Sequence, residues 1–479
     1  METTANSPTA RPWPVREWML IAAMAALAHP AALLIGLVVL AALVVLSAWV
    51  PFVWIALPAV AFTVISAVTH RARFHGHAVR PAEEPELTIL VRQAAERLDF
   101  RVPLLVRIVA EPEVAVVPTR TSGFRTFTLF LGLPLVRRLT AAELVAVVAR
   151  EFAHQQHAGD RRTSLLLRAR DSLVESRENR FRAPAGLVER LLRASQARTW
   201  QLALAADADA AAVAGTPAVR NALAQVGTVS AAFYLFVATW VGVLGEDGDF
   251  PEDLYEALDA ALADPHVASR LAADADENPP MAAAIEPPLA ARLAALPEHL
   301  GVGWDTSASV ALRQLDSLRR RCVRDLVSSE EAAGELRPVR LLDIAPERFE
   351  ASLREAASHL VEVTGQEFVG GAVAAAADAL VDGTWMRLAQ AIDPEVGRLP
   401  QPMRAGAASD VLVGCLSHVI GGMLLEAGWA RVSRWTASVL VGPDGALLDV
   451  EELLELAVDT GDPTRIRELL PILTERAAR

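Results

Sequence analysis

The residues from Trp18 to Thr69 include no Asp, Glu, Lys or Arg. One membrane-spanning helix needs about 20 consecutive apolar residues, so this run is long enough for two spans. Pro51 lies among several aromatic residues, which favour the interface between membrane and water. We therefore predict a polar tail over residues 1–17 and a transmembrane helical hairpin over 18–70, with helices near 28–48 and 52–69.

Positive charges flank this apolar run on both sides. Two arginines precede it, Arg11 and Arg16. Four basic residues follow it, namely His70, Arg71, Arg73 and Arg80. Positive flanks stay on the cytoplasmic side, so both ends of the hairpin are expected there. The alternative is a signal peptide cleaved near Ala28, but the apolar run continues past that point. We therefore expect a multi-pass protein of the cell inner (plasma) membrane, with the lipid bilayer as a partner and the main domains in the cytoplasm.

Composition excludes several other classes of protein. Of the 479 residues, 53% are hydrophobic, which agrees with a membrane part. The net charge of −13 argues against nucleic acid as a partner, because binding phosphates requires a basic face. The chain has two cysteines, Cys322 and Cys415, and is therefore too poor in cysteine for a disulfide framework.

The rest of the chain is predicted to be mainly α with a small β-sheet. Residues 87–99 resemble an amphipathic helix, whereas residues 102–117 and 126–131 have the alternation of strands. Thr140 and Glu143 form a capping box that opens a buried helix. After the polar segment Ala273–Pro280, further helices and a hairpin-like turn at Gly442–Gly445 follow. We predict one domain over 84–300 and a helical C-terminal domain of unknown role over 301–479.

The buried helix contains Arg150-Glu151-Phe152-Ala153-His154, which differs at one position from the zinc-binding pattern His-Glu-x-x-His. Residues four apart share a helix face, so two such histidines grip one zinc ion. The Glu acts as the general base on a zinc-bound water, and a third ligand comes from another part of the protein.

The stretch Leu139–Asp160 resembles the active-site helix of the HtpX-like and CAAX-prenyl-protease-like zinc metallopeptidases. In that family a Glu-x-x-Ala-Asp element supplies the third ligand, and Ala203 to Asp207 matches it. A His-Pro-Pro-Leu element before an Arg-containing helix is matched by Glu286 to Leu289 with Arg292. The resemblance covers roughly residues 18–300. It implies an α+β, zincin-like metallopeptidase domain carried on a membrane anchor.

The same resemblance places Arg150 and Ala203 at two of the three zinc-ligand positions. Arginine stays protonated and has no lone pair to give, and alanine cannot bind a metal. The general-base position, Glu151, and one ligand position, His154, keep their usual residue types. We therefore predict that no metal cofactor is bound. We also predict that Arg150 takes the metal position and pairs with carboxylates, with Asp207 the leading partner and Glu151, its neighbour on the helix, a weaker one.

Three functions stay open at this point. The first is a catalytically inactive pseudoprotease that binds a protein or peptide in the former substrate cleft. The second is an active zinc endopeptidase with an unusual ligand set, for which His154, His157 and Asp207 are the candidates. The third is a membrane-tethered helical interaction protein whose C-terminal unit does the work. The arginine-rich stretch 161–198 is read either as a solvated helical face or as a contact with anionic lipid head groups.

Overall fold

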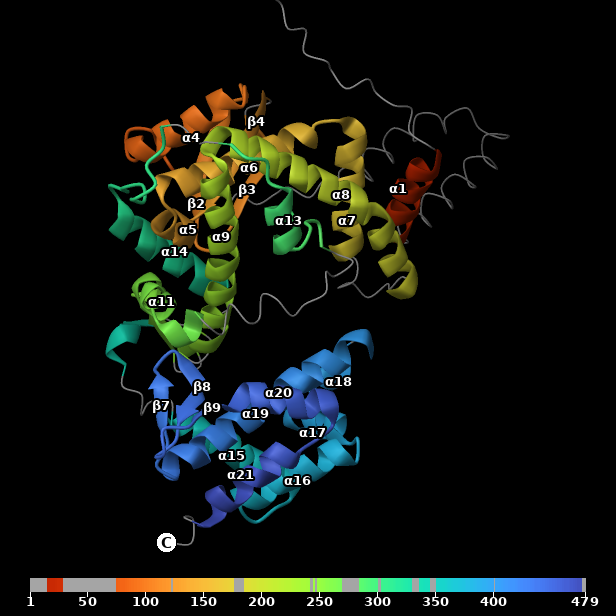
Figure 1. Cartoon of the computed structure of the whole chain (residues 1–479), viewed down its shortest axis with the longest axis vertical. Coiled ribbons are helices and arrows are strands. Elements are labelled where there is room, and N and C mark those ends of the chain that lie inside the picture. The colour runs from red at the N-terminus through yellow and green to blue at the C-terminus, as the bar shows by residue number, and fades with distance from the viewer. Residues whose placement is uncertain are drawn as a thin grey trace, which may run out of the picture. The chain divides into compact units, whose positions relative to one another are not determined.

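The computed structural model describes residues 15–28, 75–121, 124–175, 185–241, 244–245, 248–268, 284–299, 303–329, 336–344, 350–399 and 401–475. The described part is mainly helical with small sheets, as the sequence predicts (Figure 1). Of the membrane hairpin predicted over 18–70, residues 18–28 belong to a described helix, and the rest lies outside the described residues.

The chain divides into two compact units. Unit 1 comprises Met1–Leu235 with Asn278–Ala333, and unit 2 comprises Phe236–Glu277 with Gly334–Arg479. This division differs from the expected boundary between residues 300 and 301. Phe236–Glu277, before that boundary, belongs to unit 2, and the residues from 301 to Ala333, after it, belong to unit 1. Each of these segments packs with a distant part of the chain.

The sheet of unit 1 has the strand order β1-β2-β4-β3. Strand β1 (His77–Ala78) is antiparallel to β2 (Leu104–Val109), which runs parallel to β4 (Phe124–Gly132). Strand β3 (Val114–Thr121) forms an antiparallel hairpin with β4. The central strand β4 is buried on both faces from Thr126 onward, which explains its nearly continuous apolar sequence.

Helix α6 (Ala141–His157) carries the motif identified in the sequence. The predicted capping box is present, because Thr140 Oγ1 accepts from Glu143 N at 3.3 Å and Glu143 Oε2 accepts from Thr140 N at 2.9 Å. Helix α6 packs against α4 (Pro85–Arg97) and most extensively against α8 (Ala185–Ala214). Both α6 and α8 bury many alanines, and small side chains allow two helices to approach closely.

A segment after residue 300 holds the N-terminus of α6 in place. Ala141 N donates to Ala308 O at 2.8 Å, and Ala142 N donates to Asp305 O at 2.9 Å. The buried carboxylate of Glu84 accepts from the backbone N–H groups of Arg313 and Gln314, both at 2.7 Å. These bonds satisfy donors that a helix start leaves open, and they tie this segment and α14 (Leu315–Ser329) to unit 1.

Three further helices of unit 1 form a small separate core. Helix α1 (Val15–Ala28) packs on α7 (Arg161–Glu175) and on α8 (Figure 1). The buried side chains of this core are Ile21, Met24, Ala28, Leu166, Ala169, Leu173, Val188 and Leu192. The remaining helices of unit 1 are α5 (Leu133–Arg138), α9 (Thr216–Phe236), which reaches the boundary of the unit, and α13 (Leu289–Ala295).

Unit 2 begins with a π-helical turn, Val237–Val241, and short parallel strands β5 (Asp249–Pro251) and β6 (Arg337–Val339). Buried Asp253 accepts from the backbone N–H groups of Leu341 at 2.6 Å and Leu342 at 3.1 Å, which joins the two segments of this unit. Its helices are α11 (Leu254–Leu262), α15 (Glu350–Thr364), α16 (Val369–Val381), α17 (Trp385–Ile392), α18 (Glu395–Arg398), α19 (Gln401–Glu426), α20 (Val450–Thr460) and α21 (Thr464–Glu475).

Helix α19 lies at the centre of the apolar core of unit 2. Among the described residues, its part Arg404–Glu426 is the one helical stretch long and apolar enough to cross a membrane. The predicted turn at Gly442–Gly445 is confirmed, because it leads into the antiparallel pair β8 (Thr436–Val441) and β9 (Leu447–Asp449), next to β7 (Ala430–Ser433). Asp449 caps helix α20, since its carboxylate accepts from the N–H groups of the first turn of that helix.

Candidate functional site

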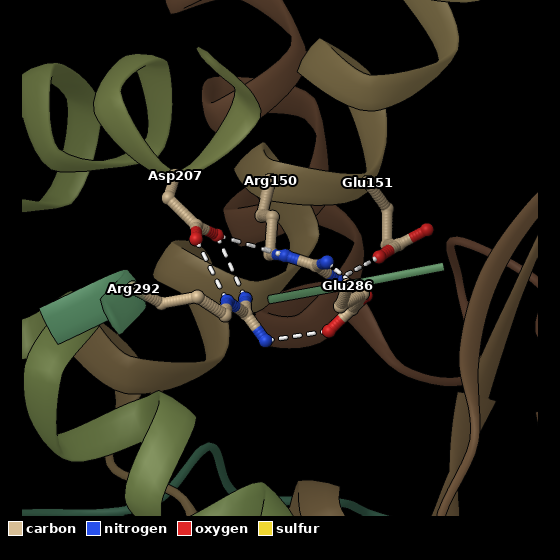
Figure 2. A network of polar contacts seen from close by, with 5 residues as sticks. All are labelled: Arg150, Glu151, Asp207, Glu286 and Arg292. Atoms are coloured by element: carbon tan, nitrogen blue, oxygen red, sulfur yellow. Dashed lines mark hydrogen bonds and ion pairs between the residues drawn. The ribbon is translucent and has the colours of Figure 1, made fainter. Parts of the chain in front are cut away.

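Five charged side chains from three parts of unit 1 meet beside helix α6 (Figure 2). Arg150 and Glu151 come from α6, and Asp207 comes from α8. Glu286 precedes α13, and Arg292 lies within that helix. We call these five residues the charge cluster. Its members are up to 142 positions apart in the chain, so tertiary packing alone brings them together.

Arg150 lies at the centre of the charge cluster. Its Nε donates to Asp207 Oδ1 at 3.0 Å, its Nη1 donates to Glu151 Oε1 at 2.7 Å, and its Nη2 donates to Glu286 Oε1. The side chain of Arg150 is only 11% exposed. All three guanidinium nitrogens therefore bind carboxylates, which meets the requirement that a buried charge be paired.

The predicted ion pair between Arg150 and Asp207 is confirmed. Glu151, expected as a weaker partner, also binds Arg150, and this contact is 0.3 Å shorter than the contact with Asp207. Adjacent residues on a helix point in different directions, but the arginine side chain is long enough for its guanidinium to reach its neighbour's carboxylate.

Arg292 completes the charge cluster from the other side. Its Nε and Nη2 donate to the two oxygens of Asp207, both at 2.8 Å, and its Nη1 donates to Glu286 Oε2 at 2.5 Å. The fork of a guanidinium fits a carboxylate in this bidentate way. Asp207 is therefore bound by two arginines, which allows its carboxylate to be 99% buried.

The charge cluster contains three carboxylates and two guanidiniums. Burial raises the pKa of Glu151 to about 7, although the positive charge of Arg150 opposes the rise. Burial also acts to raise the pKa of Glu286, but Arg150 and Arg292 outweigh it and hold that pKa below its usual value. Glu151 is therefore the carboxylate that exchanges a proton near neutral pH, and its protonated form makes the charge cluster neutral.

Arg150 stays protonated in this setting. Burial acts to lower its pKa, but the neighbouring carboxylates of Glu151, Glu286 and Asp207 together raise it above the usual value. The pKa of His154 is lowered, first by burial and then by the charge of Arg150. His154 therefore favours its neutral form beside the guanidinium of Arg150.

The donor set around α6 does not fit a zinc ion. Ala203 is buried on α8, one helical turn before Asp207, and offers only a methyl group where the resemblance implies a ligand. Arg150 brings a positive charge to the position where the resemblance implies the first ligand, and it repels any cation placed there. A single histidine, His154, is too few protein ligands for a stable zinc site.

The alternative ligand set of His154, His157 and Asp207 is not brought together. His157 Nε2 contacts Asp209 Oδ2 at 2.8 Å near the surface, and the oxygens of Asp207 are taken by the two arginines. Across the described parts of the chain, no three His, Cys, Asp or Glu side chains are placed to hold a metal ion together.

Sequence reasoning identified Glu286 and Arg292 only as parts of a resembling element, and it missed their role in binding Arg150 and Asp207. The available signal was the number of charges on apolar segments. An arginine and an aspartate on two buried helices require further partners to balance them.

Comparison of the chain with protein-family models, with curated proteins and with solved structures finds no match.

Proposed function

We propose that this protein is a membrane-anchored, metallopeptidase-like pseudoprotease, catalytically inactive, that acts by binding or scaffolding a protein or peptide. The observation that carries the proposal is the position of the Arg150 guanidinium, bound by Asp207, Glu151 and Glu286 where the resemblance implies a metal ion. A cation that is part of the chain balances the carboxylates in place of a metal cation.

The chemistry of the charge cluster supports the loss of peptidase activity. A zinc peptidase uses its metal to polarise the scissile carbonyl and to lower the pKa of the attacking water. A guanidinium supplies neither an open coordination position nor a metal-bound hydroxide. Glu151 alone, as a general base, contributes typically about 10²–10⁴-fold, far below the acceleration of a peptidase.

The membrane part of the proposal is supported by the uncharged run from Trp18 to Thr69 and by the arginines on both of its sides. We propose that this run anchors the chain in the inner membrane with both units in the cytoplasm. Resistance to carbonate extraction tests the anchoring. Digestion of unit 1 and unit 2 by protease only after the inner membrane is opened tests the orientation, and digestion from the outside of intact cells would contradict it.

Zinc stoichiometry tests the inactive state. The full chain is purified in detergent, freed of metal by chelator, dialysed against zinc and then against metal-free buffer, and its zinc is measured by mass spectrometry. The native chain should hold far less than one zinc per chain. The double variant Arg150→His/Ala203→Glu should bind near one, because it creates a His, His, Glu set with His154.

The single variants are the controls for this experiment. Arg150→His alone should bind zinc more weakly than the double variant, because it lacks the third ligand. Ala203→Glu alone should bind none, because Arg150 is retained. If the native chain holds one zinc per chain and digests casein in a chelator-sensitive way, the proposal of an inactive enzyme is wrong.

Hydrogen–deuterium exchange tests the binding part. Unfolded casein, a general substrate of peptidases, should slow exchange near the C-terminal half of α6 while staying uncut, and should leave α20 and α21 unchanged. Equal exchange of α6 with and without casein would contradict binding at the former active site.

A further inference from the structure

Helix α1 has an exposed side as well as a buried one. Ile21, Met24 and Ala28 are buried in the core that α1 shares with α7 and α8. On the opposite side, Met19 is 61% exposed, and the exposed residues of the next turns are alanines.

The exposed face of α7 combines leucine with arginine. Arg161, Leu165 and Arg168 are all exposed, and their spacing of four and three residues places them on one face of the helix. Leu165 is 42% exposed between the two arginines. Arginine side chains next to an exposed apolar residue are typical of a helix at a lipid interface, where the charge reaches the head groups and the apolar atoms stay below.

The first half of α8 repeats this pattern. Leu187, Arg190, Ala194 and Arg198 are exposed and follow each other at spacings of three, four and four residues. Leu187 is 42% exposed, as is Leu165 on α7. Glu189 lies on another side of the helix, where Arg193 binds it at 2.8 Å. The shared face of Leu187 and Arg190 therefore keeps its positive charge.

The charge of this region opposes that of the whole chain. Between residues 161 and 198 there are ten arginines and four acidic residues, in a protein of net charge −13. The uncharged run that begins in α1 continues along the chain to Thr69. An anionic bilayer complements both features, because its acyl region accepts Met19 and its phosphates attract arginines.

We propose that α1, α7 and α8 form a docking platform that lies on the surface of an anionic lipid bilayer. The platform rests on the proposed anchoring of the chain in a membrane and adds a second, electrostatic contact to it. Met19, Leu165 and Leu187 lie below the level of the phosphates, and Arg161, Arg168 and Arg190 bind the phosphates.

Spin labels on the full chain in lipid vesicles test the platform. Cys415 is replaced by alanine, Cys322 is fully buried and stays, and single cysteines are placed at Met19, Leu165, Leu187 and, as a control, Ile89. Ile89 is a 54% exposed apolar residue of α4 in the same unit. In vesicles of phosphatidylcholine with phosphatidylglycerol, labels at the three platform positions should collide with oxygen more than with a water-soluble nickel complex. The label at Ile89 should show the reverse.

Lipid charge and arginine variants test the electrostatic part. In phosphatidylcholine alone, or at high salt, the labels at Leu165 and Leu187 should move into water. The triple variant Arg161→Gln/Arg168→Gln/Arg190→Gln should lower the equilibrium constant of the surface contact by about fivefold per arginine, or roughly 100-fold. The control triple variant Arg92→Gln/Arg138→Gln/Arg313→Gln removes three exposed arginines of the same unit and should leave the contact unchanged.

The outcomes separate the platform from the anchor. Water exposure at Leu165 and Leu187 in anionic vesicles, with the chain still resistant to carbonate, overturns the platform and leaves the anchor standing. Release of the chain from vesicles by carbonate overturns both. An equal effect of the two triple variants also overturns the platform, because it shows a general loss of charge.

Discussion

Replacement of Arg150 by leucine removes the central cation of the charge cluster. Asp207 keeps the bidentate contact with Arg292, and Glu286 keeps one contact with Arg292 and is 42% exposed. The main loss therefore falls on Glu151, which is 15% exposed and paired with Arg150 at 2.7 Å. Removing one partner of a buried ion pair costs about 3–5 kcal/mol. Because Arg292 still pairs with Asp207 and Glu286, Arg150→Leu should lower the free energy of unfolding by about 3 kcal/mol at pH 8.

The destabilisation caused by Arg150→Leu should be smaller at pH 6. The positive charge of Arg150 is what opposes the rise in the pKa of Glu151, so the leucine variant raises that pKa above its value of about 7. Glu151 is then protonated at pH 6 and no longer needs a counter-charge. Each unit by which its pKa rises is worth about 1.4 kcal/mol, and only one pH unit lies between the native pKa and pH 8, so the destabilisation at pH 6 should be lower than at pH 8 by up to about that amount.

Hydrogen exchange of peptides from α6 and α8, measured on the full chain in detergent, gives the free energy of opening at both pH values. Arg150→Lys keeps the charge but lacks the planar fork, so its destabilisation should lie between those of the native chain and the leucine variant. Arg138→Leu, at an exposed arginine, is the control for loss of charge. The reasoning fails if Arg150→Leu leaves the opening free energy unchanged at pH 8, or if the loss is larger at pH 6.

Three further changes test the fold and the charge cluster. The pKa of Glu151 is raised from 4.5 to about 7 on folding, so this carboxyl contributes stability that is complete below pH 4.5 and is lost as the pH rises through 7. Glu151→Gln should remove up to about 3 kcal/mol of this pH dependence of the unfolding free energy. Unfolding curves between pH 5 and 8 measure the change. Thr140→Ala should destabilise α6 by about 1 kcal/mol, seen as faster exchange in its first turn, because it removes the acceptor for Glu143 N. Asp253→Ala should destabilise unit 2 by about 1–3 kcal/mol in urea unfolding, because it leaves two backbone donors without their acceptor. Unchanged unfolding of unit 2 would contradict the proposal that Asp253 joins its two segments.

Much of the fold followed from local patterns in the sequence. The capping box at Thr140 and the cap at Asp449 depend on residues two or three positions apart, so they are readable without any tertiary information. The alternation around residues 102–131 was enough to predict strands. The sequence did not reveal the unit boundary, because the hydrogen bonds that place residues 303–314 in unit 1 join backbone groups whose partners are far away in the chain.

The residue types alone show that positions 150 and 203 cannot bind a metal ion. An arginine at position 150 and an alanine at position 203 lack lone pairs for a metal in any conformation, so this conclusion depends on side-chain chemistry alone. The partners of Arg150 and Asp207, in contrast, depend on the tertiary structure. Glu286 and Arg292 reach Arg150 and Asp207 because α13 and the residues before it pack beside α6 and α8. Convergence of this kind depends on where distant helices lie, which no local pattern of residues encodes.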